Sequence, residues 1–144
     1  MTNEDVDNLE WEADEIDFLT LEDVYEIHAE GLRRFTPTEP AGVRDPGLLE
    51  SAVERPKVTW GGEFLYSSLA EMAAAYLYGL AQNHAFENGN KRVGFAATSF
   101  FLRINGYRLT LSQNEAVELT MNVVNGIWDQ EKAAEVLLNG MELL

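Results

Sequence analysis

The sequence contains no cysteine, which excludes disulfide bonds and metal sites built from thiolates. It also lacks an apolar run long enough to cross a membrane, and its acidic, polar start is unlike a signal peptide. Basic residues are scarce, with 10 Lys and Arg against 25 Asp and Glu, so the net charge is -15. Because nucleic-acid binding needs a basic face, this charge argues against a direct nucleic-acid partner. We therefore expect a cytoplasmic protein that binds neither membranes nor nucleic acid.

The acidic charge is concentrated near the N-terminus. Eight carboxylates fall between residues 3 and 17, with no Lys or Arg among them. We interpret residues 1–17 as an acidic, flexible tail, with Trp11 and Ile16 as apolar anchors, and residues 18–144 as one domain. The 144-residue length and 46% hydrophobic content suit a single domain with its own core. The low lysine content fits a salt-adapted proteome as well as it fits an acidic tail on an ordinary protein.

Helix signals dominate the chain after the tail. Thr20 followed by Asp23 resembles a capping box, and Asp45 before Pro46 supplies an N-cap and a first-turn proline. Apolar residues recur at three- and four-residue steps in two central segments. The expected helices span about residues 20–35, 47–54, 67–84, 90–106, 112–126 and 129–138. We therefore predict an all-α fold, a bundle of about six helices.

Residues 55–66 interrupt the helical pattern just before the central pair. Pro56, Gly61 and Gly62 mark a loop, and the residues between them have strand-like propensity. We expect an ordered flap or a small hairpin, in which Trp60 is either part of the core or a contact for a partner.

The segment from His84 to Arg92 joins the two central helices and carries the chemically informative residues. It reads His-Ala-Phe-Glu-Asn-Gly-Asn-Lys-Arg, so the second helix starts with two cations. A helix N-terminus offers unpaired N–H groups to an anion, and Gly89 allows close approach to the backbone. Lys91 and Arg92 oppose the helix dipole at a cost of about 0.3–1 kcal/mol each, which a bound phosphate would reverse. The segment therefore predicts a phosphate-binding site.

His84 is one of two histidines in the chain. Beside a bound phosphate, a histidine can take the proton from an attacking hydroxyl. Taken singly, a histidine at a helix end is more often a cap, and a Lys–Arg pair is usually a solvated surface. Phe86 is expected to anchor the loop in the core in either case, and His28 is expected to be structural. The ordered combination is what favours a catalytic site.

That combination resembles the signature of the Fic/Doc superfamily, His-x-Phe-x-(Asp/Glu)-(Gly/Ala)-Asn-(Gly/Lys)-Arg. Lys91 stands where nucleotidyl-transferring Fic proteins have glycine, and Phe95 stands where they have a second arginine. Both positions are similar to the death-on-curing (Doc) branch. Upstream blocks of Doc proteins are similar to residues 18–22, 42–52 and 55–56. The resemblance covers about residues 18–140, and it implies that residues 18–144 form a Fido domain, a Fic/Doc-type helical bundle with a short flap.

The resemblance also implies a toxin of a toxin–antitoxin pair. Doc proteins use ATP to phosphorylate a threonine of translation elongation factor Tu, which stops protein synthesis. By this resemblance His84 is the general base, and Lys91 and Arg92 assist catalysis. The nucleotide phosphates would be held by Gly89, Asn90, Lys91 and Arg92. The flap at residues 57–66 would help to dock the protein target, and a cognate antitoxin would be the second partner.

Asn88 departs from the signature, because the family has an acid there that ligates Mg²⁺. An amide oxygen can coordinate a hard cation but brings no charge. Mg²⁺ could still bind through the ATP phosphates and water. Two alternatives therefore stay open beside the kinase: Fic-type nucleotide transfer (AMPylation) to a protein hydroxyl, and a catalytically weak member that binds nucleotide or antitoxin.

Inhibition is expected to come from a separate chain. Many Fic proteins carry an inhibitory helix with a Ser/Thr-x-x-x-Glu-(Gly/Asn) motif, and this sequence has none. The nearest match, Glu30-Gly31, has Glu26 where Ser or Thr is needed. Restraint by an antitoxin is therefore expected, and such antitoxins commonly order a flexible segment on the toxin. The acidic tail is a rival candidate, since its carboxylates could compete with phosphates for Lys91 and Arg92.

Overall fold

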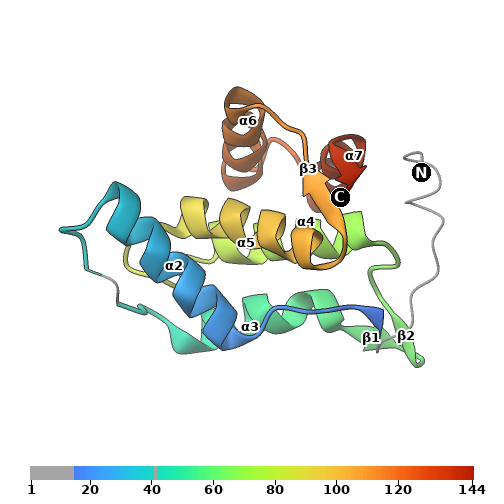
Figure 1. The fold of residues 1–144 in the computed structure, drawn as a ribbon. Helices are drawn as coiled ribbons and strands as arrows, with labels where there is room; N and C mark the ends of the chain where they lie inside the picture. The colour runs from blue at the N-terminus through green and yellow to red at the C-terminus, as the bar shows by residue number, and fades with distance from the viewer. Residues whose placement is uncertain (1–14, 41) are drawn as a thin grey trace.

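The computed structural model describes residues 15–40 and 42–144. Within them the chain forms six α-helices and two pairs of short antiparallel strands (Figure 1). In chain order the elements are α2 (Leu21–Phe35), α3 (Pro46–Glu54), the 3-10 turn η2 (Arg55–Lys57), β1 (Thr59–Trp60), β2 (Glu63–Phe64), α4 (Leu69–Gln82), α5 (Asn90–Ile104), β3 (Tyr107–Leu109), α6 (Gln113–Val124), α7 (Gln130–Asn139) and β4 (Met141–Leu143). The predicted helical bundle is therefore confirmed, and no helix in the described ranges is long and apolar enough to span a membrane.

Helix α4 is the centre of the core. Eleven of its 14 residues are buried, because α3, α5, α6 and α7 all pack against it. A helix that is apolar on every side needs such an enclosure, whereas its neighbours each bury one face. Alanine makes up much of α4, and its small side chain lets the surrounding helices approach closely.

Two glycines set the closest of these approaches. A Cβ on Gly94 of α5 would lie 2.9 Å from the Cβ of Ala81 and 3.0 Å from its backbone nitrogen. A Cβ on Gly79 of α4 would lie 3.0 Å from the Cβ of Ala52 in α3. The distance at Gly94 is shorter than real Cβ atoms show, and the distance at Gly79 is tight enough that Ala52 would have to move. The absence of a side chain at these positions therefore allows α4 to contact α3 and α5 directly.

The segment before α2 is docked onto the core. Ile16 is buried, and the backbone N–H of Leu19 donates to the buried hydroxyl of Tyr76 at 2.9 Å. The backbone N–H of Asp17 donates to the side chain of Asn105 at 2.9 Å. Part of the segment predicted to be a flexible tail is thus held in place, whereas Trp11 and residues 1–14 lie outside the described residues.

Helix caps match the sequence patterns. Complete capping boxes join Thr20 to Asp23 and Ser112 to Glu115. Asp45, Ser68 and Asp129 each accept the backbone N–H three residues on. Among the described helices, α5 differs: its N-cap has no side-chain hydrogen bond.

The hairpin predicted before the central pair is present, formed by β1 and β2. Trp60 at its tip is 84% exposed, which excludes a role in the core. The hairpin precedes α4, whereas the His84 segment follows it, and the 14 residues of α4 separate the two by about 21 Å. It therefore lies at the opposite end of α4 from the loop that joins α4 to α5 (Figure 1), so it does not border that loop, and its expected role in docking a protein target stays a prediction.

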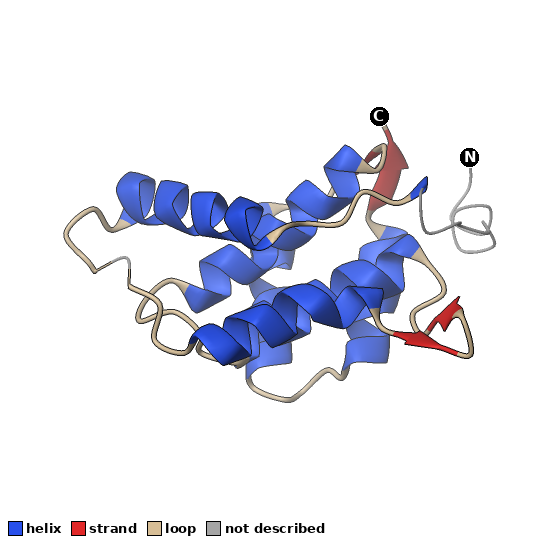
Figure 2. Ribbon diagram, turned by 90° about the horizontal axis from the view of Figure 1, so that it is seen from below, coloured by secondary structure: helices blue, strands red, loops and turns tan. Residues whose placement is uncertain are grey.

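The second strand pair was not expected from the sequence. Strand β3 pairs with β4 at the same end of the molecule as the hairpin (Figure 2). The two strands have three residues each; in the sequence β3 precedes α6 and β4 follows α7. Neither has enough residues to show the alternating pattern of a strand, so only the packing of the helices brings them together.

The close contact between α4 and α5 generates a test with a matched control. Gly94→Ala should lower the free energy of unfolding by up to about 2 kcal/mol, because overpacking costs about 1–3 kcal/mol and the gain in helix propensity returns only about 1 kcal/mol. Gly31→Ala, inside α2, faces only the flexible chain of Arg92 at 3.4 Å. It should be neutral or stabilising in urea unfolding. Equal effects of the two substitutions would contradict the packing explanation.

Candidate functional site

The loop between α4 and α5 reverses the chain direction in seven residues, 83–89. Two of these have left-handed backbone: His84 with φ 53° and Gly89 with φ 78°. Glycine adopts this conformation freely, whereas a histidine does so at a cost of about 1–3 kcal/mol when the surrounding structure imposes it. The His84 side chain is exposed, and it has no hydrogen-bond partner within the described part of the chain. It is therefore free to meet a ligand.

Phe86 anchors this loop in the core, as the sequence predicts. Its side chain is 1% exposed. The ring of His28, from α2, stacks on it at a centroid distance of 3.7 Å and an interplanar angle of 14°, and the ring of Tyr25 meets its edge at 6.3 Å. Two side chains of α2 thus enclose the middle of the loop.

Asn90 closes the loop on itself. Its side-chain oxygen accepts the backbone N–H of Phe86 at 3.0 Å, and its side-chain nitrogen donates to the carbonyl of Phe86 at 2.9 Å. The amide is the side-chain group that can both donate and accept in this way. The side chain of Asn90 is therefore occupied within the loop, and its backbone N–H is the group left to meet a ligand.

The connection between α2 and α3 lies alongside the loop. The carbonyl of Ala85 accepts the backbone N–H groups of Arg44 and Asp45 at 2.7 and 3.0 Å, and the N–H of Glu87 donates to the carbonyl of Gly42 at 3.0 Å. Val43 and Phe86 form an isolated antiparallel bridge. Sequence reasoning missed this pairing, although residues 42–52 were one of the blocks that carried the resemblance. This connection, and not the β1–β2 hairpin, is the segment that borders His84.

The start of α5 is the electropositive part of the site. Gly89 is its N-cap and supplies no side chain, so the first N–H groups of the helix have no side-chain acceptor. Lys91 and Arg92 are both exposed in the first turn, and no acidic side chain of the described residues forms an ion pair with either. Unpaired N–H groups and unpaired cations at one helix end together form a binding site suited to an anion.

Arg92 is held against the end of α2. Its guanidinium lies 4.7 Å from the centroid of the Phe35 ring, and Nη1 is 3.4 Å from the Thr36 hydroxyl. A cation–π contact of this kind is worth about 0.5–1 kcal/mol at an exposed position. The contact orients Arg92 without neutralising its charge, which remains available to an anion.

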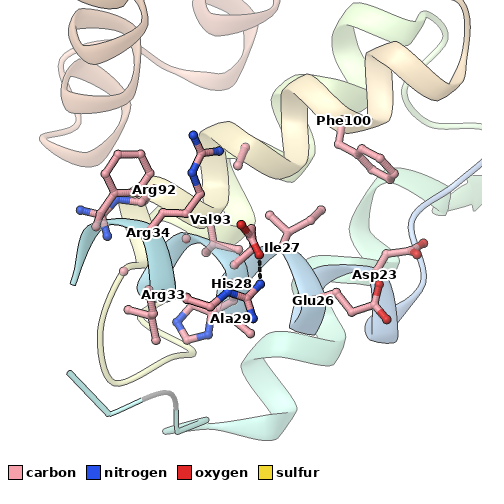
Figure 3. A pocket seen from close by; sticks show the side chains of 16 residues that line it. Asp23, Glu26, Ile27, His28, Ala29, Arg33, Arg34, Arg92, Val93 and Phe100 are labelled. Atoms are coloured by element: carbon pink, nitrogen blue, oxygen red, sulfur yellow. Dashed lines mark ion pairs between the residues drawn. The ribbon is translucent and has the colours of Figure 1, made fainter. Parts of the chain in front are cut away.

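Two grooves meet at Arg92. One, of 680 Å³, runs between α2 and α5 over Ile27, Val93 and Phe100. Figure 3 shows Arg34 and Arg92 toward one end of it and Asp23 and Glu26 toward the other. The second, of 620 Å³, lies between α5 and α6, and its lining combines Lys91 and Arg92 with apolar side chains that include Phe95, Leu109, Val117 and Met121. The cationic helix start thus opens onto apolar surface on both sides.

His28 is buried beneath the loop and bound to it. It is 3% exposed, and its Nε2 lies 2.7 Å from the carbonyl oxygen of Asn88. Burial lowers the pKa of His28 below its ordinary value of 6.5, and the hydrogen bond to Asn88 opposes this shift in part. The imidazole is therefore neutral at pH 7.

The described residues do not fit a protein-held Mg²⁺. They contain no group of three His, Asp or Glu side chains able to hold a metal ion. Asn88, at the position of the family acid, uses its amide nitrogen to donate to the carbonyl of Pro40 at 3.3 Å. It ties the loop to the α2–α3 connection and offers a metal one uncharged oxygen.

Comparisons with known proteins agree with the motif. The model of the Fic/DOC family matches residues 18–102. The toxin Doc of Mycolicibacterium smegmatis is 52% identical over 67 residues, which are 46% of this chain and 52% of that toxin. The protein kinase doc of Escherichia phage P1 is 30% identical over 96 residues, 67% of this chain and 75% of the kinase. The match thus spans about half the length of the first relative and three quarters of the second.

The buried histidine makes stability depend on pH. Because the pKa of His28 is lower in the folded chain than in the unfolded one, the unfolded chain binds a proton that the folded chain does not as pH falls below about 6.5. The free energy of unfolding should therefore decrease as the pH is lowered through this range. The decrease should be larger in the wild type than in His28→Gln, which lacks the titrating group. Urea unfolding of both proteins from pH 8 to pH 5 measures the difference, and parallel curves would contradict it.

Proposed function

The chain belongs to the Fic/DOC family, and from that premise we propose that it is a toxin of a toxin–antitoxin pair that transfers phosphate from ATP to a protein hydroxyl. The observation that carries the proposal is the start of α5, where uncapped N–H groups, Lys91 and Arg92 lie one short loop away from the exposed His84. Phosphoryl transfer depends mainly on positioning and on charge stabilisation, and this arrangement supplies both.

In the proposed reaction the phosphates of ATP bind at the start of α5. The backbone N–H groups of Gly89 and Asn90 and the side chains of Lys91 and Arg92 stabilise their charge. The hydroxyl oxygen of the target then forms a bond to the γ-phosphorus as the bond to the bridging oxygen breaks. ADP leaves with that electron pair, and the hydroxyl proton passes to His84. The cations offset the charge that develops on the transferred group.

The net charge of the chain does not oppose this binding. Surface charges are screened beyond about 8 Å at physiological ionic strength. Lys91 and Arg92 would be much closer than that to the phosphates, whereas eight of the 25 acidic residues fall between residues 3 and 17 and the others are spread along the rest of the sequence. The local cations therefore outweigh the total charge of -15.

Elongation factor Tu is the proposed protein substrate, since the Doc branch that the motif resembles acts on a threonine of that factor. The name of the phage P1 relative, a protein kinase, supports phosphate transfer. The α2–α3 connection takes the docking role expected of the flap, because it pairs with the loop through Gly42, Arg44 and Asp45. Its position beside Ala85 and Glu87 would let it present the target hydroxyl to His84.

A cognate antitoxin is the proposed inhibitor, consistent with a relative named toxin Doc. The α5–α6 groove supports the idea, because its apolar wall adjoins Lys91 and Arg92. A segment with one apolar face and nearby carboxylates could bury the first and place the second on the cations. It would then exclude the nucleotide phosphates by occupying their site.

Two other functions remain as alternatives. Nucleotide transfer to a hydroxyl would use the same cations, but Phe95 replaces the second arginine typical of Fic proteins. Binding of nucleotide or antitoxin without turnover is favoured by Asn88, which lacks the charge of the family acid and is hydrogen-bonded to Pro40.

Mass spectrometry of elongation factor Tu after incubation with ATP and Mg²⁺ separates the three functions. We expect a gain of one phosphate with the wild type and a rate reduced by about 10²–10⁴-fold with His84→Ala, the usual contribution of a general base. The exposed position of His84 predicts that the variant keeps its fold, which circular dichroism checks. A gain of one nucleotide would indicate AMPylation, and an unmodified substrate would indicate a binding protein.

Calorimetry with a non-hydrolysable ATP analogue tests the phosphate site. Lys91→Ala and Arg92→Ala should each weaken binding by about 10- to 100-fold, because a hydrogen bond to a charged group is worth about 1.5–3 kcal/mol. Lys132→Ala is the control, since Lys132 lies in α7 and pairs with Glu135. Affinities equal to the control would place the phosphates elsewhere.

A further inference from the structure

His28 contacts both sides of the loop that precedes α5. Its ring stacks on Phe86, and its Nε2 lies 2.7 Å from the carbonyl oxygen of Asn88, two residues further on. A carbonyl only accepts hydrogen bonds, so Nε2 carries the proton in this contact. One buried side chain of α2 thus fixes the middle of the loop and its last peptide before the helix.

The bond to Asn88 has a consequence for the next residue. The carbonyl of Asn88 and the N–H of Gly89 belong to one planar trans peptide and point in opposite directions. A donor that holds the carbonyl on the α2 side therefore turns the Gly89 N–H away from α2. The peptide cannot rotate to any large extent without breaking the bond to His28.

Gly89 is also the residue that needs this support. It is the N-cap of α5, its φ is 78°, and it has no side chain with which to cap the helix. The Nε2 and Cδ2 atoms of His28 lie 3.5 and 3.6 Å from where a Cβ of Gly89 would be. Glycine has more backbone freedom than any other residue, so an external contact is required to hold it in one conformation.

An apolar aromatic residue would fill the position of His28 at a lower cost if packing were its only role. A phenylalanine could stack on Phe86 without losing the hydration that imidazole loses on burial, a loss seen in the lowered pKa of His28. What the imidazole adds to an apolar ring is the hydrogen bond to Asn88. The acceptor of that bond belongs to the Asn88–Gly89 peptide, which directly precedes the anion site at the start of α5.

We propose that His28 is a positioning residue for the phosphate site: through Asn88 it orients the peptide of Gly89 and the first N–H groups of α5. This inference deepens the proposed function and rests on it for the identity of the ligand. His28 itself touches neither substrate, and it acts through the backbone of the loop.

Two substitutions separate the donor from the ring. His28→Phe keeps an aromatic ring on Phe86 and removes the donor. His28→Gln removes the ring and keeps an N–H group at about the distance of Nε2. If His28 only fills space, His28→Phe should be the milder change. If it positions Gly89, His28→Gln should be the milder change for the site, even where it costs more stability.

The first measurement needs no ligand. The NMR order parameter of the Gly89 amide should be near 0.85 in the wild type and His28→Gln, typical of rigid backbone, and should fall toward about 0.6 in His28→Phe. A rigid Gly89 in His28→Phe would overturn the proposal. If His28→Phe does not fold, His28→Leu provides the variant without a donor.

The second measurement is binding of the non-hydrolysable ATP analogue by calorimetry. We expect a loss of about tenfold for His28→Phe, the upper range for one neutral hydrogen bond, and a loss below about threefold for His28→Gln. The proposal would be overturned if the loss of affinity in each variant simply paralleled its loss of stability, measured as the midpoint of urea unfolding. A wild type that binds no analogue would refute the proposed function, whereas the order parameters would still decide the role of His28.

Discussion

The contact of α5 with α4 at Gly94 and Ala81 is the constraint on which the site depends. These residues lie near the ends of the two helices that face the loop, so the helices are close together where the chain must turn. Seven residues have to reverse the direction of the chain over that short gap. Left-handed backbone at His84 and Gly89 is the result, and with it His84 points to solvent while Gly89 starts α5 without a cap.

The same constraint makes the loop depend on its neighbours. Such a short loop has few partners of its own, and the side chain of Asn90, at the start of α5, closes back on Phe86. The remaining support comes from α2, through His28, and from the α2–α3 connection, through its pairing with Ala85 and Glu87. A site on a loop becomes precise when rigid elements hold it in this way, and here buried contacts set the order of the loop that carries His84.

The features that the sequence predicted are local ones. Capping patterns at Thr20 and Asp45 located two helices, and the apolar spacing of α4 and α5 located the central pair, because each signal is contained within one helix. The pairing of β3 with β4, the bridge between Val43 and Phe86, and the far position of the hairpin were all missed. Each of these joins segments distant in sequence, and it follows from how the helices pack and not from any residue pattern. For His28 the burial was foreseen, and its bond to Asn88 was not.

Asn88 shows how one substitution changes the balance of forces at such a site. Its amide nitrogen donates to the carbonyl of Pro40, which a carboxylate could not do, since an ionised acid has no proton to donate. An aspartate there would instead place its charge near that carbonyl oxygen and near incoming phosphates. The asparagine thus exchanges a charge able to bind a metal for a hydrogen bond between the loop and the α2–α3 connection. In that arrangement the negative charge of a bound phosphate would be balanced by the cations at the start of α5 and not by a metal ion held at Asn88. Lys91 and Arg92, unpaired with any acidic side chain of the described residues, are the groups that can meet it.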